Sequence, residues 1–123
     1  MDTYLENETW VVERGGEVVE KMADPARHPL SDVERLIYCL WAADYGMRNA
    51  GHLEAAEDIH PGFHAEGASL ARSLGLPKTS SLFSLTPLEL EKNYFDRLTD
   101  VRLEIQRADV PSPDTSPEPP RDR

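Results

Sequence analysis

The sequence predicts a mainly α-helical chain, with one small domain of four to five helices over residues 1–108 and a disordered, proline-rich tail over residues 109–123. Two capping boxes, S-D-V-E at residues 31–34 and T-P-L-E at residues 86–89, mark helix starts. After each start, apolar residues recur every three or four positions, which is the spacing of one helix face. A chain of 123 residues can bury one core but not two.

In the amino-terminal segment, residues 1–24, a strand prediction competes with a helix prediction. Two valine-rich runs flank Gly15 and Gly16, and such a dipeptide accepts the positive φ values of a two-residue hairpin turn. We therefore expect a short β-hairpin or arm here, with a helix over residues 17–23 as the alternative. The prolines that follow predict an extended link, because each disfavours helix in the residue before it.

The first helix of the body is expected to begin at Ser31, whose side chain can accept an early backbone N–H while Glu34 reaches back. It should end at a turn containing Asn49 and Gly51, since both residue types tolerate the left-handed conformation. Asp44 falls on the apolar stripe of this helix. We expect its carboxylate to reach water, because carboxylates are rarely buried unpaired, with a buried carboxylate that orders the next loop as the alternative. The stripe consists of Val33, Leu36, Ile37, Leu40, Trp41 and Met47.

Two helices are expected after that turn. A short one over residues 53–59 should stop at Pro61 and Gly62, because proline interrupts helical hydrogen bonding. The next should end where Gly75 can take the left-handed conformation and Pro77 prevents continuation. Its inward stripe consists of Phe63, Gly67, Leu70, Ala71 and Leu74.

The carboxyl-terminal part should contain one long helix and then the tail. Residues 80–85 are compatible with a helical turn, and the long helix should run from its capping threonine, Thr86, to about residue 107. The tail, residues 109–123, contains five prolines and almost no apolar side chain. Such a composition predicts an extended linker, with a polyproline ligand as the functional alternative. The inward stripe of the long helix consists of Leu90, Tyr94, Leu98, Val101 and Ile105.

The charge balance narrows the class of partner. The chain has 23 acidic and 13 basic residues and a net charge of −10, which argues against direct binding to nucleic acid or an anionic membrane and favours a basic partner. The sequence shows no signal peptide and no apolar run long enough for a membrane span, so we expect a cytoplasmic protein. The single cysteine, Cys39, excludes an internal disulfide and a cysteine-based zinc cage, and we expect an inert, partly buried thiol within a helix.

Three histidines fall in one short segment and raise the question of a metal site. His60 and His64 are four residues apart, and on a continuous helix both could bind one metal, with His52, Glu57 or Asp58 as further ligands. The proline that follows His60 disfavours a continuous helix there. We therefore expect these histidines to flank helix ends without a metal. Because no hydrolase, phosphate-loop or dinucleotide motif occurs either, we expect no enzyme activity and no cofactor.

The negative charge gathers in two segments. Residues 1–24 hold seven acidic residues against two basic ones, and residues 52–66 hold four acidic residues and no basic one. On the short helix three of these carboxylates are spaced three and four residues apart and should share one face. The candidate partner-binding residues are Glu54, Glu57, Asp58 and Glu66, with Glu13, Glu17 and Glu20 as a second patch.

Three stretches carry a resemblance to a known family: ERLIYCLWAADYGMRNAGHLEAA at residues 34–56, GASLARSLGL at residues 67–76 and YFDRLTD at residues 94–100. Over about residues 31–105 the chain resembles a bacterial family of unknown function that contains an acidic DNA-mimic protein. In that family an apolar helix runs into an Asn-Gly-Gly-aromatic turn, then a helix rich in small residues follows, and the closing helix has an aromatic-aspartate-x-leucine pattern. The matching positions are Asn49, Gly51, Phe95, Asp96 and Leu98.

The chain departs from this family at the turn, where Ala50 replaces the first glycine and His52 replaces the aromatic residue. The resemblance implies an all-helical fold without known catalysis. In one branch of the family it also implies a surface that occupies the DNA site of a transcription factor.

Three functions follow as hypotheses. The first is a non-enzymatic, acidic, DNA-mimic-like binding protein that occupies the basic surface of a DNA-binding regulator, with a homodimer as a further option. The second is an immunity or antitoxin protein that neutralises a basic nuclease. The third is a metal-dependent hydrolase that uses His52, His60 and His64 with Asp58.

Overall fold

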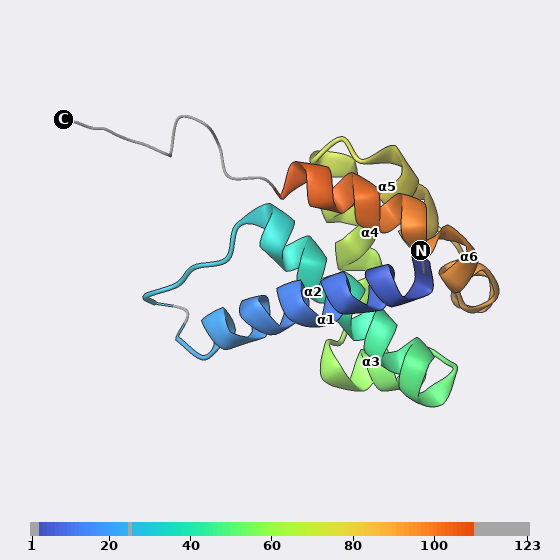
Figure 1. The fold of residues 1–123 in the computed structure, drawn as a ribbon, viewed down its shortest axis with the longest axis horizontal. Coiled ribbons are helices and arrows are strands. Elements are labelled where there is room, and N and C mark those ends of the chain that lie inside the picture. The colour runs from blue at the N-terminus through green and yellow to red at the C-terminus, as the bar shows by residue number, and fades with distance from the viewer. Residues whose placement is uncertain (1–2, 25, 110–123) are drawn as a thin grey trace.

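The computed structural model describes residues 3–24 and 26–109, and these residues form six helices and no strand (Figure 1). The all-helical prediction is confirmed, although the number of helices exceeds the predicted four to five. Almost all of the predicted proline-rich tail lies outside the described residues. No helix within the described ranges is long and apolar enough to cross a membrane. The helices are α1 (Thr3–Met22), α2 (Asp32–Ala50), α3 (Glu54–Ile59), α4 (Phe63–Ser73), α5 (Pro77–Phe83) and α6 (Pro87–Ala108).

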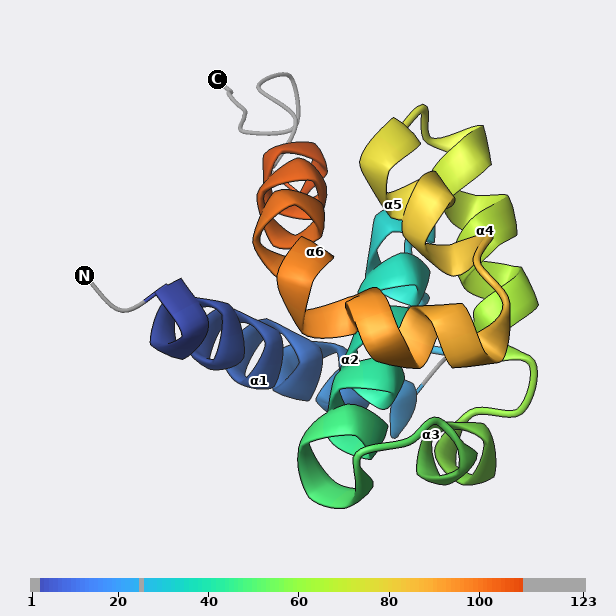
Figure 2. The ribbon, with the colours of Figure 1, turned by 90° about the vertical axis from the view of Figure 1, so that its right-hand side faces the viewer.

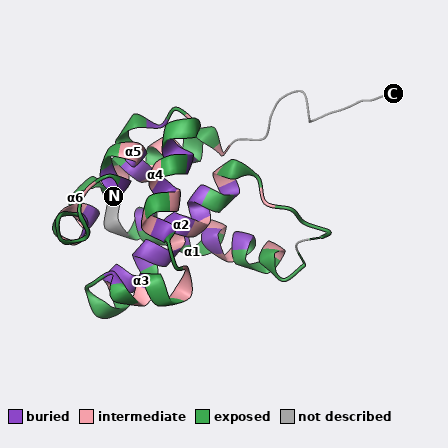
Figure 3. Cartoon of the chain, turned by 180° about the vertical axis from the view of Figure 1, so that it is seen from behind, coloured by how far each residue is buried: buried purple, intermediate pink, exposed green. Residues whose placement is uncertain are grey.

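Helix α2 is the centre of the fold. It packs against α1, α3, α4 and α6, while α5 joins α4 to α6. Two perpendicular views place α1 on one side of α2 and α4 with α5 on the other (Figures 1 and 2). Buried residues are concentrated on α2 (Figure 3). The largest fully buried side chains include Leu36, Leu40, Phe63, Leu82, Phe83, Tyr94 and Leu98.

The hairpin prediction for the amino-terminal segment is wrong, because α1 runs through Gly15 and Gly16 without a turn. The alternative prediction of a helix over residues 17–23 is correct about the type of element, but the observed helix begins much earlier, at Thr3. Helical periodicity prevails here because it buries Val11 and Val18, seven residues apart, against α2 and α6. Gly15 permits the close approach of Trp41, since a Cβ at Gly15 would lie 2.3 Å from the Cδ1 atom of that indole.

Both capping boxes are confirmed. The Ser31 hydroxyl accepts the Glu34 backbone N–H at 3.2 Å, and a Glu34 carboxylate oxygen accepts the Ser31 N–H at 3.0 Å. Thr86 and Glu89 form the same pair of bonds at the start of α6. The predicted turn after α2 also holds, because Gly51 has a φ of 75° and donates its N–H to the last turn of α2.

Pro77 has a role beyond stopping α4, because it opens α5, which occupies residues predicted as no more than a helical turn. The first turn of α5 is capped from a distant part of the chain. Glu104 on α6 accepts the backbone N–H of Lys78 at 3.1 Å and that of Thr79 at 2.7 Å. A carboxylate at a helix start is favourable because it accepts hydrogen bonds from backbone N–H groups that have no partner within the helix, and because it interacts with the positive end of the helix dipole.

The expectation that Asp44 reaches water is wrong, since its residue is only 3% exposed. One carboxylate oxygen accepts a hydrogen bond from the Tyr94 hydroxyl at 2.6 Å and the other accepts from Arg48 Nε at 2.7 Å. Burial raises the pKa of Asp44, although both hydrogen-bond donors oppose that rise. The alternative of a buried carboxylate is correct, and it joins α2 to α6 through Tyr94.

A second ionic cluster ties α1 to the start of α2 and the end of α6. Arg14 lies 3.2 Å from Glu34 and 2.7 Å from Asp109, and Lys21 pairs with the same Glu34 carboxylate. Burial alone would raise the pKa of Glu34, but hydrogen bonds from Lys21, the Ser31 N–H and Arg14 outweigh it and hold the pKa at about 2. The folded state therefore favours the ionised form of Glu34.

We expect the change Glu34→Gln to flatten the loss of stability in acid. In the wild-type protein this group stabilises the fold above its ordinary pKa of 4.5, and that contribution disappears as the pH falls towards about 2. Glutamine still completes the capping box, so the change removes the charge alone. Urea unfolding between these pH values measures the effect. The matched control is Glu89→Gln, at the same capping position of α6 but on an exposed side chain, and an equal acid profile for both variants would contradict the prediction.

Candidate functional site

The outward side of α1 carries a row of carboxylates. Glu6, Glu13 and Glu20 are all exposed and follow one another at intervals of seven residues. Seven residues make nearly two helical turns, so these side chains lie along one edge of the helix at intervals of about 10.5 Å. Both basic residues of α1, Arg14 and Lys21, pair with Glu34.

An apolar row runs beside the carboxylates. Val12 is 53% exposed and Val19 is 37% exposed, and Leu5 continues the same seven-residue spacing with an exposure of 58%. Exposed large apolar side chains at such a regular spacing are a feature of surfaces that other proteins cover. We call the surface formed by Glu6, Val12, Glu13, Val19 and Glu20 the outer face of α1.

The carboxylates of the outer face differ in whether they form hydrogen bonds or ion pairs within the protein. The carboxylates of Glu13 and Glu20 form no hydrogen bond or ion pair with any residue in the described part of the chain. Glu6 lies 3.9 Å from Arg102, close to the limit of an ion pair. The neighbouring Glu17, predicted as a contact residue, pairs with Arg14 at 3.1 Å. Glu13 and Glu20 are therefore the carboxylates of this face with the greatest freedom to meet a partner.

A groove between α1 and α6 adjoins the outer face. Its wall includes the half-buried indole of Trp10, and Arg102 is held in it by a hydrogen bond from its Nε to Asn7 Oδ1 at 2.9 Å. The groove extends the apolar area that a bound partner could cover. The residues that line it are Leu5, Glu6, Thr9, Trp10, Glu13, Thr99, Arg102 and Leu103.

Helix α3 carries the second acidic patch. Glu54, Glu57 and Asp58 are exposed, as predicted for one face of a short helix. Glu57 accepts the backbone N–H of Gly62 at 3.2 Å and so orders the turn into α4. The carboxylates of Glu54 and Asp58 have no polar partner among residues 3–24 and 26–109.

Glu66 does not belong to either exposed patch. One of its oxygens lies 2.6 Å from His60 Nε2 and the other lies 3.0 Å from Arg35 Nη2. Both oxygens are thus engaged within the protein, and the side chain is only 25% exposed. A partner at the surface would meet Glu54 and Asp58 before it met this carboxylate.

The four candidate ligands of the alternative metal hypothesis, His52, Asp58, His60 and His64, do not form a cluster among the described residues. His52 accepts the Glu54 backbone N–H through Nδ1, and His64 stacks on Phe63, with ring centroids 5.9 Å apart. Of the four, His60 alone belongs to a group of three potential ligands in the described ranges, and its neighbours there are Cys39 and Glu66.

The turn residues Asn49 and Gly51 have structural roles. The Asn49 side chain donates a hydrogen bond to the Tyr45 carbonyl oxygen at 2.9 Å, and Gly51 closes α2 with its positive φ. Gly46 lets α3 approach α2, because a Cβ there would lie 2.9 Å from the His52 carbonyl oxygen.

Two features of these sites escaped the sequence-based predictions. The outer face was hidden by the hairpin prediction, although the seven-residue spacing of Glu6, Glu13 and Glu20 is visible in the sequence. The approach of Cys39 to His60 carries no local sequence signal, because the two residues come from different elements.

The chain has been compared with protein-family models, with curated proteins and with solved structures, and none of the three comparisons gave a match.

Proposed function

We propose that this protein is a non-enzymatic, acidic binding protein whose outer face of α1 docks on the basic surface of a partner, in the manner of a DNA mimic on a DNA-binding regulator. The supporting observation is a row of exposed glutamates, two of whose carboxylates have no polar partner in the described chain, beside exposed Val12 and Val19. The carboxylates attract a cationic surface, and the valines supply apolar area that the partner removes from water.

The spacing of the row is compatible with a DNA-binding surface. Its carboxylates repeat at about 10.5 Å along α1, and the phosphates of one DNA strand succeed one another with a rise of about 3.4 Å along the axis of the duplex. The carboxylates are thus more widely spaced than the phosphates, so the row would meet only some of the basic side chains of such a surface. Lysine and arginine side chains that contact phosphates are long and flexible enough to reach such positions.

The α3 patch supports the same proposal as a second contact area. Glu54 and Asp58 are exposed, and their carboxylates have no polar partner within the described residues. Both α1 and α3 pack on α2, so one rigid core holds the two acidic patches. A partner that spans both patches would meet negative charge on each.

A second copy of this chain is a poor occupant of the outer face. Two copies that paired through α1 would bring their rows of Glu6, Glu13 and Glu20 close together, and like charges at close range disfavour association. A partner with lysine or arginine beside apolar side chains would pair with the row of carboxylates and cover the row of apolar side chains. This argument favours a basic partner over a homodimer at this face.

The test compares two double charge reversals in affinity capture from extracts of the native host. Glu13→Lys/Glu20→Lys alters the outer face, and the control Asp96→Lys/Asp100→Lys alters exposed residues of α6 with the same change in net charge. We expect the α1 variant to bind the captured basic partner at least about tenfold more weakly, while the control stays close to wild type. Binding should also weaken as salt rises, because exposed charges are screened over about 8 Å at physiological ionic strength.

Three outcomes would count against the proposal. If both variants bound the partner equally weakly, the net charge of the protein would explain the binding and the outer face would have no specific role. Capture that survives molar salt would show that charge attraction does not hold the complex. Failure of duplex DNA to compete for the partner would remove the DNA-mimic part and favour another basic target, such as a nuclease.

A further inference from the structure

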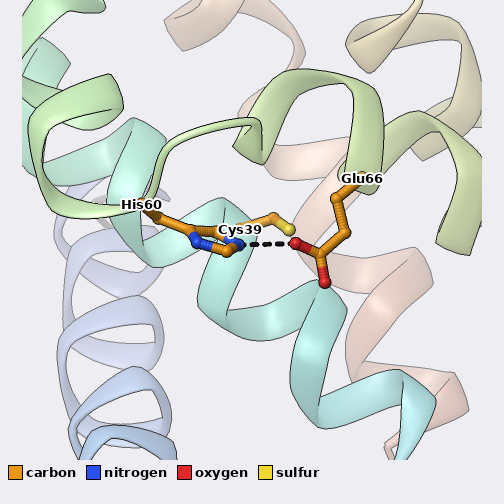
Figure 4. Close-up of side chains that lie close together, drawn as sticks. All are labelled: Cys39, His60 and Glu66. Atoms are coloured by element: carbon orange, nitrogen blue, oxygen red, sulfur yellow. Dashed lines mark hydrogen bonds and ion pairs between the residues drawn. The ribbon is translucent and has the colours of Figure 1, made fainter.

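Three kinds of metal-binding side chain converge beneath α4. Cys39 comes from α2, His60 follows the last turn of α3, and Glu66 comes from the first turn of α4 (Figure 4). One potential ligand atom from each lies within 4.8 Å of the other two. The described part of the chain contains no other group of three histidine, cysteine or carboxylate ligands at this spacing.

The separations are close to those of a metal site. Zinc binds thiolate sulfur at about 2.3 Å and imidazole nitrogen or carboxylate oxygen at about 2.0–2.2 Å, which places neighbouring ligand atoms of a tetrahedron about 3.3–3.6 Å apart. His60 Nε2 and Glu66 Oε1 lie 2.6 Å apart, joined by a hydrogen bond. Movements of about 1 Å would therefore convert the cluster into a coordination shell.

We propose that Cys39, His60 and Glu66 bind one zinc ion, with water in the fourth position. Zinc accepts sulfur, nitrogen and oxygen ligands together, whereas calcium and magnesium require oxygen ligands and disfavour a thiolate. Three protein ligands with one open position is the arrangement of zinc sites that remain accessible to small molecules.

The site is open to solvent on the side where His60 and Glu66 lie. Cys39 is fully buried, but the side chains of His60 and Glu66 are 22% and 25% exposed. An ion can therefore approach from the solvent side, where these two side chains have room to adjust. The ring of Tyr38 lies against the His60 imidazole, with centroids 4.7 Å apart, and restricts its orientation.

The charges around the cluster suit a divalent cation. Arg35 holds Glu66 Oε2 at 3.0 Å, which leaves Oε1 as the ligand atom and orients the carboxylate as a neighbour of a metal ligand commonly does. A thiolate and a carboxylate beside one guanidinium leave a negative surplus for the ion. Cysteine binds zinc as the thiolate, so the ion would replace the proton on the Cys39 sulfur.

The bound ion would join α2 to the segment that contains α3 and α4. It would thus stabilise the support of the α3 acidic patch without touching that patch. Because the ligands lie outside the outer face of α1, the charge reversals of α1 should leave zinc binding unchanged. The two proposals can therefore fail separately.

The test uses the full chain without a polyhistidine tag, loaded with zinc or with cobalt. We expect about one zinc ion per chain by elemental analysis and a thiolate-to-cobalt charge-transfer band in the cobalt-loaded protein. His60→Ala and Glu66→Gln should each weaken zinc binding by at least about tenfold, and zinc should raise the thermal midpoint of the wild-type protein but not of His60→Ala. The control His64→Ala should bind as the wild type does.

Sub-stoichiometric zinc in the wild-type protein would overturn the proposal. So would a His60→Ala variant that binds zinc normally, or a cobalt complex without the thiolate band. Cys39→Ala should lose that band. If this variant does not fold, the two partly exposed positions, His60 and Glu66, still decide the question.

Discussion

Replacing Arg48 with methionine is expected to lower the free energy of unfolding by about 3 kcal/mol at neutral pH, because it leaves a buried carboxylate without its cation. Arg48 donates a hydrogen bond from Nε to Asp44 at 2.7 Å, and its guanidinium also lies over the Phe95 ring, 5.2 Å from the centroid. Methionine keeps much of the apolar stem of the side chain, so the lost charge dominates the effect. Urea unfolding of the two proteins measures it.

The pH dependence identifies Asp44 as the cause. A buried carboxyl whose folded pKa is raised binds more protons in the folded state than in the unfolded state, so its ionisation removes stability as pH rises above the ordinary pKa of 3.8. Without Arg48 the pKa of Asp44 should rise further. The difference between wild type and the Arg48→Met variant should therefore shrink as the pH is lowered from 7 towards about 4.

A double variant supplies the control. Asp44→Asn combined with Arg48→Met removes both charges, so it should recover more than half of the stability that Arg48→Met alone loses. The side-chain amide introduced at position 44 can still accept the hydrogen bond from the Tyr94 hydroxyl. Additive effects of the two changes, together with a loss that does not depend on pH, would contradict the role assigned to the buried pair.

Most helix boundaries after residue 30, except those of α5, could be predicted because local chemistry determines them. The two capping boxes and the left-handed Gly51 and Gly75 are recognised from short stretches, and the structure contains each of them. At Gly15 and Gly16 the local chemistry favours a turn, and tertiary packing overrides it. The deciding contact is with Trp41, which is distant in sequence, so local patterns could not reveal it.

The candidate sites also divide into features that local sequence determines and features that tertiary packing determines. The exposure of Glu54, Glu57 and Asp58 could be predicted because three carboxylates on one face of a short helix have no reason to enter a core. The burial of Asp44 could not, because it depends on a hydroxyl that α6 brings from far along the chain. The cluster of Cys39, His60 and Glu66 likewise requires the packing of three elements.

The second large effect concerns two adjacent glycines of α1, where substitution by alanine should change the free energy of unfolding in opposite directions. Gly15→Ala should lower the free energy of unfolding by up to about 2 kcal/mol, because overpacking costs about 1–3 kcal/mol and the gain in helix propensity offsets about 1 kcal/mol of it. The new methyl carbon would lie 2.3 Å from Trp41 Cδ1 and 3.0 Å from Trp41 Cβ. The indole cannot simply swing away, since it stacks on Tyr38 and Tyr45.

Gly16→Ala is the matched control, because it makes the same chemical change one position along the same helix. A Cβ at Gly16 meets no atom within 4 Å, so only the propensity gain remains and the variant should be more stable by about 0.5–1 kcal/mol. Urea unfolding followed by tryptophan fluorescence measures both. If α1 did not cross Trp41 in solution, or if the segment were a hairpin, the two variants would not differ in this direction. An alanine at Gly15 that stabilises the protein as much as one at Gly16 would therefore contradict the observed packing of α1 on α2.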